Sequence, residues 1–70
     1  MKKLIELLND DAIKGKRNKV FAELLYNKNG IVRTSNLHYI NSAYDLSDKY
    51  NLNLSIKRVD YSADHIIKFV

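Results

Sequence analysis

A chain of 70 residues is long enough for one small domain, which buries only about 60% of the surface that its unfolded form exposes. Hydrophobic residues make up 46% of the sequence, which argues against intrinsic disorder, and the absence of Cys excludes a disulfide framework. The formal net charge of +4 favours an anionic partner.

The first predicted element is a short N-terminal helix over residues 1–9. Its four apolar residues are enough for about two helical turns: Leu4, Ile5, Leu7 and Leu8. We expect this apolar surface to be able to join two copies of the chain as a homodimer. Glu6 interrupts the apolar run far short of the roughly 18 residues that a membrane span needs, so we expect a cytoplasmic protein with no membrane partner.

The second predicted element is the main amphipathic helix, which is capped at its start by Asn9 or Asp10 and ended by Asn29-Gly30. Its apolar residues recur at helical spacing and predict one buried stripe: Ile13, Val20, Phe21, Leu24 and Leu25. Basic residues occupy much of the remaining face: Lys14, Lys16, Arg17 and Lys19. Gly30 suits the left-handed position that follows the end of a helix.

Two brief helices are predicted after a short β-branched strand at residues 31–33. The first is capped at residues 34–35 and covers residues 37–40. The second follows almost at once and runs from Asn41 or Ser42 to Tyr50. Its buried face is formed by residues at spacings of three and four: Ala43, Leu46 and Tyr50.

A β-hairpin is predicted at the C-terminal end of the sequence. Residues 52–57 alternate between apolar and polar side chains, as the residues of a half-buried strand do. Residues 60–64 form the turn, and residues 65–70 form the returning strand. The complete order is therefore helix, helix, short strand, two short helices and hairpin, within one α+β domain over residues 1–70.

The stretch from about residue 20 to residue 70 follows a pattern of core and turn positions: Phe21-x-x-Leu24-Leu25, Gly30-Ile31-Val32-x-Thr34, Ala43-x-x-Leu46-x-x-Lys49-Tyr50-x-Leu52 and Leu54-x-Ile56-x-x-Val59. In this pattern the chain resembles the small winged helix-turn-helix domains that are common in phages and mobile elements. The resemblance implies that the second short helix enters the DNA major groove and that the hairpin wing contacts the DNA backbone or the minor groove.

The resemblance and the net charge together favour a small DNA-binding regulator or DNA-architecture protein. We expect seven basic side chains to contact phosphates: Lys14, Lys16, Arg17, Lys19, Arg33, Lys57 and Arg58. Three residues of the second short helix are expected nearest the bases: Asn41, Ser42 and Tyr44. The alternative for these basic residues is a solvated helix face and, in the hairpin, protection against strand-to-strand aggregation.

The second short helix departs from the family pattern, because Tyr44 and Ser47 stand where similar domains tend to have Arg. Its exposed face also holds Asp45 and Asp48, whose carboxylates are repelled by phosphates. The alternative hypothesis is therefore a protein-binding module, such as a phage-type inhibitor or an accessory subunit, that contacts a basic protein surface. Its expected binding residues are Tyr44, Asp45, Asp48 and Tyr61.

No pattern in the sequence indicates an enzyme or a cofactor. His38 and His65 lack a paired carboxylate or a second His at useful spacing, so we expect neither metal binding nor acid–base catalysis from them. A nucleophile motif, a Gly-rich phosphate loop and a metal-ligand cluster are all missing from the sequence.

Overall fold

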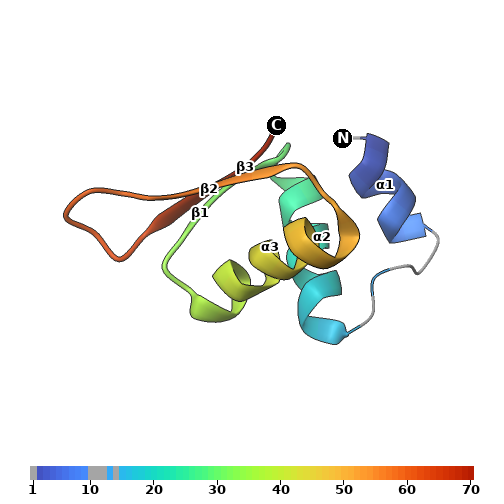
Figure 1. Ribbon diagram of the computed structural model, residues 1–70, viewed down its shortest axis with the longest axis horizontal. Helices are drawn as coiled ribbons and strands as arrows, with labels where there is room; N and C mark the ends of the chain where they lie inside the picture. The colour runs from blue at the N-terminus through green and yellow to red at the C-terminus, as the bar shows by residue number, and fades with distance from the viewer. Residues whose placement is uncertain (1, 10–12, 14) are drawn as a thin grey trace.

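The computed structural model describes residues 2–9, 13 and 15–70, which form an α+β fold of three helices and one antiparallel sheet (Figure 1). In chain order the elements are α1 (Lys2–Asn9), α2 (Lys16–Asn27), β1 (Ile31–Thr34), α3 (Leu37–Tyr50), β2 (Leu54–Arg58) and β3 (His65–Phe69). The predicted α+β class and the predicted N-terminal helix are confirmed.

The sheet has the strand order β1-β3-β2, and both pairings are antiparallel. The predicted hairpin is confirmed, because β2 pairs with β3 along its whole length and the connecting loop extends away from the helices (Figure 1). We call residues 58–65, at the end of this hairpin, the wing. Strand β1 joins the other side of β3, with Val32 opposite Ile67. This layout is compatible with a winged-helix-like fold.

Helix α3 is continuous, so the predicted division of this segment into two brief helices is wrong. Its N-cap is Asn36, whose side-chain oxygen accepts a hydrogen bond from the backbone N–H of His38 at 2.9 Å. Ser42, expected near the start of a second helix, is buried in the middle of α3. Its hydroxyl donates to the backbone carbonyl of Arg17 (3.4 Å) and so joins α3 to α2. Asn51 ends the helix in the left-handed conformation, with φ 55°.

Helix α2 begins later than predicted, because Gly15 takes a positive φ of 94° and occupies the N-cap position. Ile13 is buried but lies outside the helix. The buried face is formed by residues at helical spacing: Asn18, Phe21, Ala22 and Leu25. Val20 was predicted within this face but is 43% exposed. Of the two predicted cap residues, Asn9 belongs to α1 and Asp10 lies outside the described residues.

The end of α2 has the two hydrogen bonds of a Schellman motif. The N–H of Gly30 donates to the carbonyl of Leu25 at 2.8 Å, and the N–H of Asn29 donates to the carbonyl of Tyr26 at 3.1 Å. Asn29, with φ 57°, takes the left-handed position expected for Gly30, which also has a positive φ of 85°. The predicted helix end is therefore confirmed, with Asn29 in the role assigned to Gly30.

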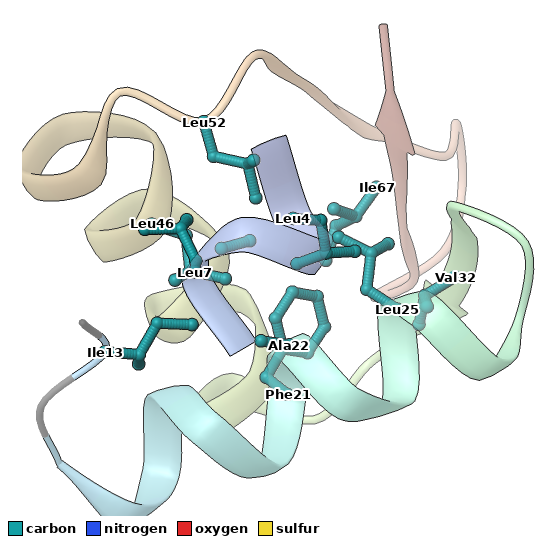
Figure 2. Close-up of a cluster of buried hydrophobic side chains, with 11 residues drawn as sticks. Leu4, Leu7, Ile13, Phe21, Ala22, Leu25, Val32, Leu46, Leu52 and Ile67 are labelled. Atoms are coloured by element: carbon teal, nitrogen blue, oxygen red, sulfur yellow. The ribbon is translucent and has the colours of Figure 1, made fainter. Parts of the chain in front are cut away.

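The core contains side chains from all three helices and from the sheet (Figure 2). Its largest fully buried apolar residues are Phe21, Leu4, Leu25, Leu46, Leu52 and Ile67. Leu4 and Leu7 of α1 belong to this cluster and are 0% and 8% exposed. Of the four residues predicted to form a homodimer surface, Leu4 and Leu7 therefore fill the chain's own core and Leu8 packs against that core. Ile5 is the exposed member of the four, at 38%.

Candidate nucleic-acid interface

The start of α2 carries three of the predicted phosphate contacts, and all are exposed: Lys16, Arg17 and Lys19. Arg17 is already engaged within the chain, because its guanidinium forms an ion pair of 3.0 Å with the carboxylate of Asp45 in α3. The ammonium of Lys49 lies 3.9 Å from the same carboxylate. The Arg17–Asp45 ion pair joins α2 to α3 and reduces the positive charge that Arg17 offers to an outside anion, whereas the Lys49 contact lies within α3. Lys14, also predicted here, lies outside the described residues.

The outward side of α3 holds Asn41, Tyr44 and Asp48, and each of them is exposed as predicted. Asp45 is partly covered, in keeping with its ion pairs. Ser42 is fully buried, so its prediction as a base contact is wrong. This side of the helix therefore presents the ring of Tyr44, the amide of Asn41 and the carboxylate of Asp48 to solvent, but not the hydroxyl of Ser42.

The wing is held by two arginine contacts. The Nε of Arg58 donates to the backbone carbonyl of Ser62 at 3.1 Å, within the loop itself. The Nε of Arg33 in β1 pairs with the carboxylate of Asp64 at 2.8 Å, at the base of the wing. Tyr61 is fully exposed in the loop with φ 59°. The residues predicted for protein binding therefore lie on two separate elements, with Tyr61 in the wing and the others on α3.

The two faces of the sheet differ in chemistry, because side chains alternate along each strand. The face toward the helices carries apolar residues of all three strands: Val32, Leu54, Ile56, Ile67 and Phe69. The opposite face, which we call the outer sheet face, consists of two rows across the strands. One row is Arg33, Ile66 and Lys57, and the other is Ile31, Lys68 and Ser55.

Three cations share the outer sheet face: Arg33, Lys57 and Lys68. Arg33 and Lys57 lie on either side of Ile66, and Lys68 is diagonal to both, a relation that places Cα atoms about 7–8 Å apart. None of the six residues on this face is acidic. Asp64 reaches Arg33 from the wing. The sequence prediction missed Lys68, although the alternation of residues 65–69 around the apolar position 67 signalled its outward direction.

Two hollows lie beside the strands. One, of about 330 Å³, lies on the outer sheet face and is lined by Ser55, Lys57, Ile66, Lys68 and Val70. The other, of about 340 Å³, is lined by residues 31–34 of β1, by Leu24 and Lys28 of α2, and by Tyr39 of α3. Ile31 and Ile66 are 52% and 39% exposed, so the outer sheet face places apolar surface between its cations.

Within residues 2–9, 13 and 15–70, no group of three or more acidic or histidine side chains is arranged to hold a metal ion. His38 is exposed in the first turn of α3, and the Nδ1 atom of His65 lies 3.3 Å from the carbonyl oxygen of Ala63. None of the helices in this described part of the chain is long and apolar enough to cross a membrane.

No protein-family model, curated protein or solved structure matches the chain. The candidate interface therefore rests on the geometry of the chain's own residues. That geometry brings Arg33 and Lys57 together with Lys68 on one face of the sheet. It leaves Lys16 and Lys19 on a helix that does not belong to that face.

Proposed function

We propose that this protein binds DNA through the outer sheet face and the wing, by phosphate contacts that do not depend on the base sequence. The observation that carries the proposal is the strand register, which places Arg33, Lys57 and Lys68 on one face without an acidic residue among its six members. Asp64 pairs with Arg33 from the wing, so Lys57 and Lys68 supply most of the positive charge of this face. Binding of this kind suits a DNA-architecture protein, because phosphate contacts position a protein on DNA but carry no sequence information.

Binding of a polyanion relieves repulsion among the cations of the outer sheet face. Neighbouring cations on paired strands repel each other and weakly oppose the folded state. Phosphates bound at the outer sheet face remove this repulsion. The release of counterions condensed on the DNA makes the free energy of binding more favourable still. The wing extends the sheet beyond the helices (Figure 1). Arg58, at the base of the wing, follows Lys57 in β2 and therefore lies on the opposite side of the strand.

Helix α3 supports base reading less well than the family resemblance implies. Ser42 is buried, and the exposed carboxylate of Asp48 is repelled by phosphates. Arg17, the guanidinium closest to this helix in the contacts described above, is paired with Asp45. We therefore assign DNA binding to the sheet and the wing, and reading of bases by α3 is no part of the proposal.

A protein partner on α3 is the second candidate function, and one observation favours it. Tyr44 is 48% exposed and precedes the exposed Asp48 by one helical turn. Tyrosine is enriched in interface hot spots, and a carboxylate attracts a basic protein surface. Tyr44→Ala separates the two candidates, because it removes the ring from α3 and leaves the outer sheet face unchanged.

The test is a titration of short fluorescein-labelled duplexes, followed by anisotropy at low and at physiological salt. Replacing both Lys57 and Lys68 with Gln removes two phosphate contacts, so the affinity should fall and the slope of log K against log salt should become shallower by about 1.8. The matched control replaces Lys2 and Lys3 with Gln, which removes the same charge from the exposed surface of α1.

Under the proposal, two duplexes of unrelated sequence bind the parent alike, and both the control and Tyr44→Ala bind like the parent. The proposal is contradicted if the parent does not bind duplex DNA at low salt, or if the Lys57 and Lys68 variant retains parental affinity. A control variant that loses as much affinity as the sheet variant would also contradict it, because net charge alone would then explain binding.

A further inference from the structure

The outer edge of β1 presents backbone groups to solvent, because the strand order β1-β3-β2 leaves one side of β1 unpaired. The hydrogen bond from the N–H of Phe69 to the carbonyl of Gly30 (2.7 Å) fixes which residues of this segment face β3. Since the direction of the amides alternates along an antiparallel strand, Ile31 and Arg33 face the outer edge. The N–H of Ile31 donates to the carbonyl of Lys28 at 3.2 Å. The N–H and C=O of Arg33 are thus the central edge groups of the strand.

A groove runs beside this edge. All four residues of β1 line the hollow of about 340 Å³, although their side chains alternate between the two faces of the sheet. A hollow lined by consecutive strand residues follows the edge of the strand rather than one of its faces. Its opposite wall is formed by Leu24 and Lys28 of α2 and by Tyr39 of α3. Four strand residues span about 13 Å at about 3.3 Å each, so the groove accepts an extended segment of about four residues.

The groove is lined by apolar side chains along its wall and by two positively charged side chains. Leu24 and Tyr39 are half-buried and face the hollow. Val20, at 43% exposed, lies one turn before Leu24 on the same side of α2, next to the residues that line the hollow but not among them. The charged residues that line the groove are Lys28 and Arg33, both exposed and both positive. An occupant with apolar and acidic side chains matches this lining.

We propose that this groove binds an acidic peptide segment as an added β-strand. Main-chain hydrogen bonds to Arg33 provide the pairing, and carboxylates of the peptide face the ammonium of Lys28 and the guanidinium of Arg33. The ion pair with Asp64 occupies the Nε of this guanidinium and leaves its terminal N–H donors for the peptide. A second copy of the chain fits less well, because edge-to-edge pairing would bring both cations of each copy together. Arg33 belongs to both sites, but the peptide proposal does not rest on DNA binding, since Lys57 and Lys68 do not line the groove.

The test uses the full chain, labelled with ¹⁵N, and as the probe a short capped peptide of Glu and Val that has two adjacent Glu residues, so that carboxylates project from both faces of the added strand. The expected result is saturable binding with amide shifts in β1, at Leu24 and at Tyr39, and slower hydrogen exchange at the N–H of Arg33. A peptide with Lys in place of Glu should bind at least about tenfold more weakly. N-methylation of one alternate set of peptide amides should abolish binding, whereas N-methylation of the other set should not, because only one set faces β1.

Two variants locate the charge effect. Lys28→Glu should raise the Kd of the Glu–Val peptide by about threefold to tenfold, since it exchanges an exposed attraction for a repulsion. Lys16→Glu makes the same charge change on the same helix outside the groove and should alter the Kd less than about twofold. Circular dichroism verifies that both variants remain folded.

Replacement of Lys57 and Lys68 with Gln should leave peptide affinity unchanged, so the two proposals fail separately. Four results would overturn this one: no saturable binding, equal affinity for the Lys–Val peptide, indifference to both sets of N-methyl groups, or a dimer of the free chain whose interface includes the Arg33 amide.

Discussion

Leu4 and Ile5 are neighbours in α1 with opposite environments, and they provide a matched pair of substitutions for the docking of this helix. Leu4 is 0% exposed within the core cluster, whereas Ile5 is 38% exposed. Leu4→Ala leaves a cavity among side chains that include Phe21 and Leu25, and truncations of this kind cost about 2–5 kcal/mol. Ile5→Ala is expected to cost about 1 kcal/mol or less, because its side chain already contacts water.

The expected loss is large for a chain of this size. At about 0.05–0.15 kcal/mol per residue, the whole domain has a stability of about 3.5–10 kcal/mol. For a domain of this length each kcal/mol lowers Tm by about 4–8 °C, so Leu4→Ala should lower Tm by at least about 8 °C. Ile5→Ala should lower it by no more than about 8 °C, and by less if the improved helix propensity of Ala offsets the lost contact.

Urea and thermal unfolding, both followed by circular dichroism, measure the difference between these two variants. Equal stability of Leu4→Ala and Ile5→Ala would refute the docking of α1 against the rest of the core. Hydrogen exchange adds a second readout, because local detachment of α1 reduces protection in residues 2–9 alone. Loss of protection in α2 and α3 as well indicates that the cavity weakens the entire core.

The remaining predictions concern the helix faces and a helix end. Leu46→Ala, at a fully buried position, should lower the free energy of unfolding by about 2–5 kcal/mol. Leu24→Ala, on the groove wall, should lower it by about 1–2 kcal/mol. Equal losses of stability in urea unfolding would contradict the half-buried position of Leu24. Asn51→Ala should cost about 1 kcal/mol because φ 55° is a left-handed conformation. Asn51→Gly should be close to neutral, and thermal melts that do not distinguish the two Asn51 variants would contradict this explanation.

The sequence predicted best those elements whose signals are local. The hairpin followed from the alternation of residues 52–57 and the polar turn, and the end of α2 followed from Asn29-Gly30. The predicted start of a second helix at Asn41 or Ser42 was wrong, and Ser42 was misplaced for a non-local reason, because its hydroxyl is bound to the backbone of Arg17 on another helix. The buried face of α2 was predicted in part: Phe21 and Leu25 are buried, but the helical spacing counted from Ile13 ignored the interruption at Gly15 and included the exposed Val20.

The candidate site was predicted in part. Arg33 and Lys57 were predicted as phosphate contacts, but nothing local in the sequence states that they lie in the same cross-strand row. That relation depends on the register of β1 against β3, and these two strands are separated in the sequence by α3 and β2. Lys68 was missed for the same reason, because its neighbours on the outer sheet face come from the other two strands.

The position of β1 in the sheet also sets an order of assembly. Pairing Arg58 with His65 closes a loop of about 7 residues, whereas pairing Thr34 with His65 closes one of about 30, which costs roughly 1.3 kcal/mol more in chain entropy. The hairpin can therefore form early from local contacts, and β1 joins late. Because β1 has only four residues and one pairing partner, it is also the strand whose detachment requires the fewest broken hydrogen bonds. Transient opening at this edge exposes Val32 and Ile67, so the native-state lifetime of the β1–β3 ladder limits how long the core stays closed to water.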